Sequence, residues 1–141
     1  DMNLALAETR IVNNVLLIVV TSDRGLCGGY NANVVKLAKA TIAEKYPMQK
    51  ITIWNIGKKG YESLSKSGYD TNADFKDIFL KLNFGNVQAA AKAAMDAFIN
   101  KEFDAIEIIY SEFKNAATQE FKAEPFLPIP KMAKKANEKK N

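Results

Sequence analysis

The residues of this chain that could do chemistry gather in one short stretch, Ser22–Gly29, which reads Ser-Asp-Arg-Gly-Leu-Cys-Gly-Gly. It supplies a hydroxyl, a carboxylate, a guanidinium and the single thiol of the sequence, set between glycines that let the backbone turn sharply. A glycine-rich loop in front of a helix presents backbone N–H groups, which often bind anions in α/β proteins. The stretch is therefore the first candidate for a ligand, substrate or protein contact.

The glycine spacing matches neither of the common nucleotide-binding motifs. The dinucleotide fingerprint needs Gly-x-Gly-x-x-Gly, whereas the glycines here are Gly25, Gly28 and Gly29. A Walker loop needs Gly-Lys-Ser/Thr at the start of the helix, and Gly29 is followed by Tyr30 and Asn31. The mismatches weigh against a small phosphate- or nucleotide-binding domain that uses this loop, which we keep as the alternative hypothesis.

Cys27 lies near a helix start and close to Arg24, a setting that favours thiol reactivity. The sequence contains no histidine, however, so the Cys-His and Ser-His-Asp arrangements are excluded. A metal site made of Asp23 with Asp74 or Asp77 has no motif spacing to support it. We expect no catalytic residue, no metal and no cofactor, with Cys27 packed in a tight turn; a cysteine-dependent enzyme is the third hypothesis.

Composition and charge indicate one globular domain that does not bind nucleic acid. The 141 residues are 48% hydrophobic, which is enough to bury a core. The formal net charge of +4 resides entirely in the lysine-rich segment 131–141, and residues 1–130 are neutral. A neutral body removes most of the support for a nucleic-acid partner that the overall basicity would suggest.

The sequence predicts neither a signal peptide nor a membrane span. The apolar residues from Leu4 to Val20 are interrupted by Glu8, Arg10, Asn13 and Asn14. We therefore expect no direct insertion into a membrane. The start at Asp1 and the lysine-rich end are what one expects of a piece of a longer protein.

Several segments have a clear secondary-structure pattern. Strands are predicted at 15–20, 51–56, near 69–74, 105–110 and 119–126, and helices at 31–45, from Gly57 to near Gly68, and at 87–100. Gly85 and Asn86 are the expected start signal of the last helix, and residues 78–84 fit a helical turn or a buried loop. Trp54, Phe75, Phe79, Phe84 and Phe98 are expected in the core.

Strands that alternate with helices predict an α/β fold, a Rossmann-like, doubly wound sheet of about five mostly parallel strands. The predicted strand order is 3-2-1-4-5. The last strand is expected to be antiparallel, because the segment before it is too short for a crossover helix. In this order the first strand lies beside the point where such sheets bind ligands, and Ser22–Gly29 follows it directly.

A small basic patch is predicted around the first long helix. Lys36 and Lys39 are three residues apart and share one face of the helix 31–45, and Arg24 precedes that helix. The spacing by itself fits a solvated helix face. The other possibility is a contact with the carboxylates of an acidic protein partner.

The stretch Thr21–Gly29 resembles the signature loop of the gamma subunit of rotary ATP synthase. Three further blocks in the same order are similar to later parts of that family, and the resemblance covers about residues 10–130. These blocks are Gly57-Lys58-Lys59-Gly60-Tyr61 with Gly68-Tyr69, Ile109-Tyr110-Ser111-Glu112-Phe113, and Pro125-Phe126-Leu127-Pro128.

The resemblance implies a central α/β domain over 10–130, followed by a flexible lysine-rich tail over 131–141. In the family this domain lies between two long helices that form the rotating shaft, and no such helices can be identified in this sequence. The implied function is that of a non-catalytic central-stalk, or rotor, domain of a proton-translocating ATP synthase. Such a domain couples rotation to ATP synthesis or hydrolysis on partner subunits.

The resemblance also implies partners and a location. The partners are the catalytic beta and alpha subunits, the epsilon subunit and the membrane c-ring, on the cytoplasmic face of the bacterial inner membrane. Because the family's loop and following helix face an acidic loop of the beta subunits, Arg24, Lys36 and Lys39 are the implied contacts. The implied signature-loop residues are Ser22, Asp23, Gly25, Leu26, Cys27, Gly28 and Gly29.

Overall fold

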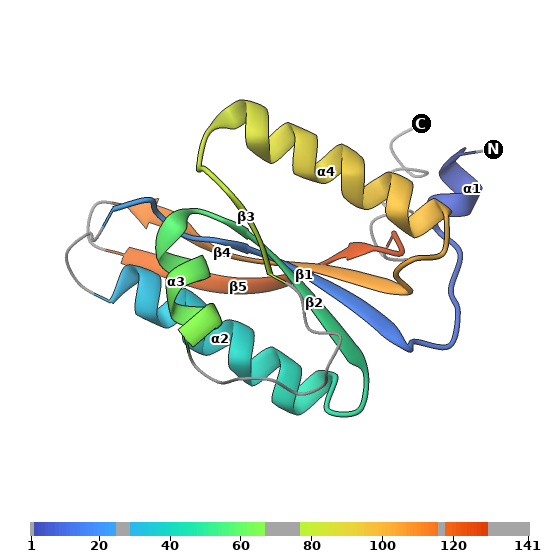
Figure 1. Cartoon of the computed structure of the whole chain (residues 1–141), viewed down its shortest axis with the longest axis horizontal. Helices are drawn as coiled ribbons and strands as arrows, with labels where there is room; N and C mark the ends of the chain where they lie inside the picture. The colour runs from blue at the N-terminus through green and yellow to red at the C-terminus, as the bar shows by residue number, and fades with distance from the viewer. Residues whose placement is uncertain (1, 25–28, 67–76, 116–117, 130–141) are drawn as a thin grey trace.

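The computed structural model describes residues 2–24, 29–66, 77–115 and 118–129. In these residues a β-sheet lies between helices on both faces (Figure 1). The elements in chain order are α1 (Met2–Leu6), β1 (Asn14–Val20), α2 (Tyr30–Lys45), β2 (Lys50–Ile56), α3 (Lys58–Lys66), β3 (Asp77–Leu80), α4 (Phe84–Ile99), β4 (Ala105–Asn115) and β5 (Thr118–Leu127).

The sheet has the strand order β3-β2-β1-β4-β5. The pairs β3 with β2, β2 with β1 and β1 with β4 are parallel, whereas β4 and β5 are antiparallel. This arrangement confirms the predicted fold class and the predicted strand order. The carboxyl ends of β1, β2 and β3 consequently meet along one edge of the sheet.

The central strand β1 contributes to two hydrophobic clusters, one on each face of the sheet. Val15, Leu17 and Val19 pack against α2 and α3, and Leu16 and Ile18 pack on the opposite face against α4. A strand covered on both faces needs apolar residues in succession, which accounts for the unbroken run Val-Leu-Leu-Ile-Val-Val. Figure 1 shows α4 on one side of the sheet and α2 with α3 on the other.

The third strand of the sheet, β3, lies in a segment that was not predicted to be a strand. The prediction near 69–74 lies outside the described residues. The helical turn or buried loop expected for 78–84 is wrong for its first part, because β3 spans Asp77–Leu80 and pairs in parallel with β2. Without β3, the outer edge of β2 would have free hydrogen-bonding groups. The Ile-Phe-Leu run forms a strand there because these residues favour strands and their backbone can pair with β2.

The helix α4 begins earlier than predicted. The side chain of Asn83 accepts a hydrogen bond from the backbone N–H of Asn86 at 2.8 Å, which makes Asn83 the N-cap. Gly85 and Asn86 therefore belong to the first turn of the helix and do not precede it. Ala90 and Ala94 are buried, and their small size lets the helix pack closely on the sheet.

The aromatic residues do not all lie in the core. Phe98 is fully buried and Trp54 is half-buried. Phe79 and Phe84 are 39% and 76% exposed, so their expected core position is wrong. Phe79 lies in a strand at the edge of the sheet and Phe84 begins the next helix, so neither belongs to the helical turn or buried loop that was expected for 78–84. Phe75 lies outside the described residues.

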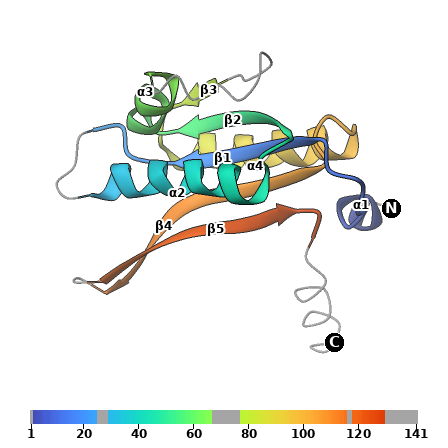
Figure 2. The ribbon, with the colours of Figure 1, turned by 90° about the horizontal axis from the view of Figure 1, so that it is seen from below.

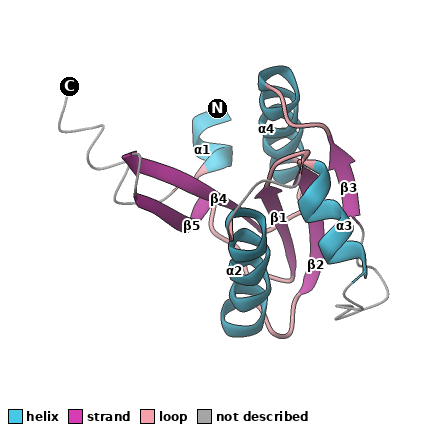
Figure 3. Cartoon of the chain, turned by 90° about the vertical axis from the view of Figure 1, so that its left-hand side faces the viewer, coloured by secondary structure: helices cyan, strands magenta, loops and turns pink. Residues whose placement is uncertain are grey.

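The β4–β5 hairpin is longer than predicted. β1 pairs with β4 only as far as Ile109, whereas β4 and β5 remain paired up to Asn115 and Thr118. The outer part of the hairpin extends away from the rest of the sheet (Figures 2 and 3).

A buried carboxylate lies between the hairpin and α2. Glu107 of β4 is 2% exposed, accepts a hydrogen bond from the Tyr46 hydroxyl and pairs with Lys45 Nζ at 2.6 Å. The pKa of Tyr46 is raised well above its ordinary value, mainly because the hydroxyl is buried and also because it donates to the neighbouring Glu107 carboxylate. The two donors from the end of α2 compensate for the burial of the charge.

At the amino end of the sheet, Arg10 and Asp104 connect the incoming chain to α4 and β4. The Arg10 guanidinium donates to Asp104 at 3.3 Å and to the carbonyl oxygens of Phe98 and Phe103 at 3.1 and 2.6 Å. Asp104 also accepts from the backbone N–H of Asn14 at 3.0 Å. We call Arg10 and Asp104 the amino-end clamp.

The two ends of the described chain lie next to each other (Figure 1). The backbone N–H of Ile129 donates to the carbonyl oxygen of Leu6 at 2.9 Å. Leu6 is buried together with Leu127 and Phe98 in the cluster under α4. Among the helices that the structure describes, none is long and apolar enough to cross a membrane.

Candidate interaction site at the carboxyl edge of the sheet

Thr21 fixes the end of β1 against the turn that follows β2. Its backbone N–H donates to the carbonyl oxygen of Ile56 at 2.8 Å, and its hydroxyl accepts from the N–H of Gly60 at 2.7 Å. Gly57 has a φ of +108°, and a Cβ added there would lie 2.0 Å from the carbonyl oxygen of Thr21. Only glycine permits this approach of the two backbones.

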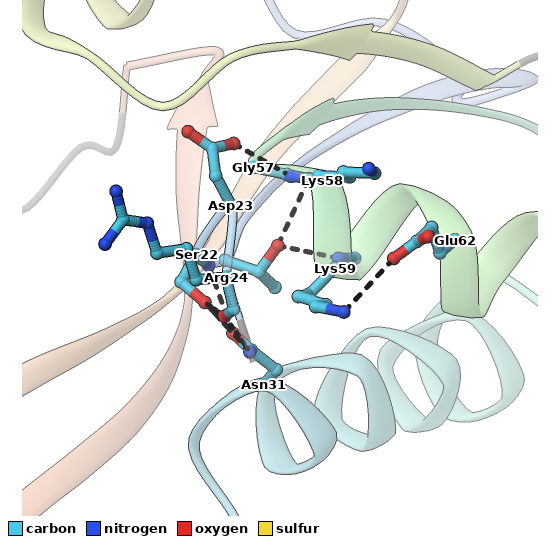
Figure 4. A network of polar contacts seen from close by, with 10 residues as sticks. Ser22, Asp23, Arg24, Asn31, Gly57, Lys58, Lys59 and Glu62 are labelled. Atoms are coloured by element: carbon cyan, nitrogen blue, oxygen red, sulfur yellow. Dashed lines mark hydrogen bonds and ion pairs between the residues drawn. The ribbon is translucent and has the colours of Figure 1, made fainter. Parts of the chain in front are cut away.

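Ser22 and Asn31 connect the loop to the first turn of α2. The backbone N–H of Ser22 donates to Asn31 Oδ1 at 3.0 Å, and Asn31 Nδ2 donates to Ser22 Oγ at 2.9 Å. The Ser22 hydroxyl also donates to the carbonyl oxygen of Arg24 (Figure 4). Asn31 was not among the predicted site residues, although an asparagine in the first turn after a glycine loop is a recognisable signal.

Asp23 occupies the N-terminus of α3. Its carboxylate accepts from the backbone N–H of Lys58 at 3.0 Å (Figure 4). It also accepts from the backbone N–H of Leu82 at 3.1 Å. A carboxylate at this position compensates for the helix dipole and satisfies N–H groups that would otherwise be free. The role of Asp23 is therefore to hold the ends of β2 and β3 together.

Asp23 and Asp77 belong to opposite ends of β3. Asp77 begins this strand, which is about 10 Å long, whereas Asp23 accepts from the backbone N–H of Leu82, beyond the other end of the strand. Asp74 lies outside the described residues. In the described ranges, no group of three or more histidine, cysteine or acidic residues is placed to hold a metal ion.

Three basic side chains line an open hollow at this edge. Arg24, Lys58 and Lys81 surround a volume of about 490 Å³ together with Asp23 and Phe79. The three cations are exposed, and none forms an ion pair with a carboxylate in the described part of the chain. The neighbouring Lys59 differs, because it pairs with Glu62 at 3.5 Å (Figure 4).

The predicted basic patch is spread along α2. Arg24 lies beside the helix start, and Lys36 is exposed six residues after Tyr30, about 9 Å along the helix axis. Lys39 is half-buried and already interacts with another group. The structure thus places Arg24 with Lys58 and Lys81 in one hollow, a grouping that the sequence analysis missed.

The remaining signature-loop positions are only partly described. Gly25, Leu26, Cys27 and Gly28 lie outside the described residues, so the packing expected for Cys27 stays a prediction. Gly29 directly precedes α2, and a Cβ added there would lie 2.7 Å from Asn33 Nδ2. A larger residue at Gly29 would require that side chain to move.

The comparison with known proteins identifies the family. The ATP synthase family model matches residues 2–141. The ATP synthase gamma chain of Cytophaga hutchinsonii is 44% identical over 127 residues, which cover 87% of this chain and 43% of the relative. This chain belongs to the family of ATP synthase gamma chains. The gamma chain of Desulfotalea psychrophila is also 44% identical, over 88% of this chain and 43% of its own length.

Solved structures of ATP synthases contain the same fold as this gamma-chain homologue. A chain of the central stalk and c-ring of the Tetrahymena thermophila mitochondrial ATP synthase matches 90% of the present chain with a TM-score of 0.62 and 27% identity, over 55% of its own length. A chain of the Euglena gracilis mitochondrial rotor matches 98% with a TM-score of 0.60 and 24% identity, over 50% of its own length, and shows the fold alone.

The family and its coverage confirm part of what the resemblance implied. The gamma chain is a non-catalytic subunit of the ATP synthase. The present chain spans less than half the length of the gamma chains named above, so it corresponds to a region of the central-stalk subunit.

Proposed function

We propose that this chain is a rotor domain of a proton-translocating ATP synthase. It acts without an active site of its own and couples rotation to ATP synthesis or hydrolysis on partner subunits. The observation that carries the proposal is the family match over residues 2–141, joined to the geometry at the carboxyl edge of the sheet. There Asp23 accepts from the N–H groups that an anionic substrate would need.

That geometry favours a protein contact over the alternative of phosphate or nucleotide binding. In ligand-binding α/β folds, free backbone N–H groups at a helix N-terminus face the phosphate. In the present domain the N–H groups of Lys58 and Lys59 donate to Asp23 and to the carbonyl oxygen of Ser22. A phosphate would have to displace a carboxylate that is part of the same chain.

The adjacent ends of the described chain support a position between two segments of a longer protein. The hydrogen bond between Leu6 and Ile129 puts the entry and the exit at one place, and adjacent ends let a domain be inserted without disturbing its host. The division into a domain over 10–130 and a flexible tail over 131–141 stays a prediction.

The partners that we propose are the catalytic beta and alpha subunits, the epsilon subunit and the membrane c-ring. Support comes from the solved structures above, which are described as a central stalk with c-ring and as a rotor. The location that follows is peripheral, on the cytoplasmic face of the bacterial inner membrane. The bacterial gamma chains among the relatives support this location.

We assign the contact with the catalytic subunits to Arg24, Lys36 and Lys39. Arg24 lies in the signature loop and Lys36 in the helix that follows it, and both side chains are exposed. Flexible cations suit repeated, transient contacts with carboxylates, because each exposed pair contributes only about 0.2–1 kcal/mol and can be broken during rotation.

Charge reversal in the full-length gamma chain of a reassembled complex tests this assignment. Arg24→Glu, Lys36→Glu and Lys39→Glu together should weaken the rotor contact by roughly 1–3 kcal/mol and lower ATP-driven proton pumping per ATP hydrolysed. Lys92→Glu, at an exposed position of α4 on the other face of the sheet, is the control and should leave pumping unchanged. Normal pumping and assembly in the triple variant would contradict the assignment.

Calorimetric titration of the chain with ATP, ADP and phosphate separates the rotor function from the alternative. We expect no saturable heat with any of the three. Micromolar binding of one of them would favour a phosphate- or nucleotide-binding domain.

A further inference from the structure

Three neighbouring strands each lead into a cation at the same edge of the sheet. The first basic residue after β1 is Arg24, after β2 it is Lys58, and after β3 it is Lys81. Because β1, β2 and β3 are adjacent and parallel, these residues line one hollow. We call them the strand-end cations.

The hollow combines this positive charge with an apolar wall. Phe79 of β3 lines it and is 39% exposed, and its ring packs against Tyr61 of α3 with centroids 5.5 Å apart. Among the described lining residues Asp23 is the carboxylate, and backbone N–H groups at two sites already occupy it. From these described residues an incoming anion would meet two more positive charges than negative ones.

The hollow is poorly suited to a single phosphate group. Phosphate sites in proteins are commonly cradles of free backbone N–H groups. At this edge the N–H groups of Gly57, Lys58, Lys59 and Leu82 all have acceptors in the domain itself. What remains for a ligand is a set of long, flexible side chains on three separate segments.

The spacing of those segments fits an extended chain. Neighbouring strands lie about 4.8 Å apart, so cations on three of them span about 10 Å. Alternate side chains of an extended peptide are about 7 Å apart and point to the same side. Two or three carboxylates of such a peptide can each reach a different cation, with an apolar side chain against Phe79.

We propose that the hollow formed by Arg24, Lys58 and Lys81 binds an extended acidic peptide segment of a partner protein. The site shares Arg24 with the contact assigned above, but it depends on Lys58 and Lys81 and not on α2. The two assignments can therefore fail separately. Electrostatic attraction between exposed groups gives this site fast, salt-sensitive binding.

Fluorescence anisotropy tests the proposal with the 141-residue chain and a dye-labelled ten-residue peptide of alternating glutamate and serine. We expect saturable binding that weakens as salt is added. Lys58→Glu with Lys81→Glu should weaken it at least tenfold. The matched control, Lys92→Glu with Lys101→Glu, changes two exposed lysines that have no role in either contact, has the same net charge and should bind within twofold of the parent chain.

Further arms decide among the other outcomes. Circular dichroism establishes that the variants are folded, and Lys58→Gln with Lys81→Gln replaces the reversal if that variant is not. No binding by the parent chain, or equal weakening by the control, overturns the proposal while the contact through Lys36 and Lys39 can still hold. Displacement of the peptide by low-millimolar inorganic phosphate at constant ionic strength would also overturn it, in favour of a phosphate site.

Discussion

Gly57 shows how one residue fixes the candidate site. Its positive φ turns the chain from β2 into α3, and the missing side chain lets the carbonyl of Thr21 come close. This contact places Lys58 at the hollow and lets Asp23 reach the N-terminus of α3. Gly57 is the first residue of a block that resembles the family, and this backbone geometry explains why a glycine is required there.

Gly57→Ala should lower the free energy of unfolding by about 3 kcal/mol or more, because it combines a disfavoured φ with a clash against backbone. Urea unfolding measures the loss. Gly85→Ala is the matched control, since a Cβ there lies 3.5 Å from Asn83 Oδ1 within α4, where alanine is favoured by about 0.5–1 kcal/mol. Equal stabilities of the two variants would refute this account of Gly57.

At the scale of elements, long apolar runs and turn signals were enough to predict most of the sheet. β1, β2, α2 and β5 lie within one or two residues of their predicted bounds, and the strand order is as predicted. The strand at Asp77–Leu80 was not predicted, because a four-residue edge strand has too few residues for a periodic pattern and is defined by its partner β2. Tertiary pairing decided what local sequence left open.

The position of β3 also limited how much of the candidate site could be predicted. The sequence indicated that Arg24 is exposed at the switch point, and the structure agrees. It did not indicate Lys58 and Lys81 as neighbours of Arg24, because their grouping requires knowing where β2 and β3 end. The partial burial of Lys39 depends on contacts that helical spacing alone does not reveal.

The amino-end clamp predicts how the connection between β1 and β4 depends on pH. Burial alone would raise the pKa of Asp104, but hydrogen bonds from Asn14 and Asn13, together with Arg10, outweigh it and hold the pKa below its usual value. The stabilisation is therefore complete above the unfolded-state pKa of about 3.9 and is lost as pH falls through the lower folded-state pKa.

Asp104→Asn should cost about 2 kcal/mol at pH 7, and its difference from the parent chain should shrink below about pH 4. Urea unfolding at pH 7 and pH 3 gives both values. Asp96→Asn changes an exposed carboxylate of α4 and should have little effect at either pH. A deficit for Asp104→Asn that is the same at both pH values would rule out the proton-linked explanation.

At the scale of the whole molecule, the two ends of the described chain depend on the same packing. Leu6→Ala should lower stability by about 3 kcal/mol, because Leu6 is 6% exposed and shares its cluster with Leu127. Leu4→Ala is the control, since Leu4 is 65% exposed and should change stability by less than 0.5 kcal/mol. Thermal unfolding compares them, and similar melting temperatures would show that α1 does not dock as described.

The meeting of Leu6 and Ile129 also determines how the domain would respond to force. A pull transmitted along a longer chain through these two points would act on the hydrogen bond between Ile129 and Leu6 and on the packing of Leu6 with Leu127, and it would not run the length of the sheet. The five strands would then lie off the line of load, as a side branch. The carboxyl edge of the sheet, with its cations, could bind and release partners without altering the mechanical continuity of the chain that carries it.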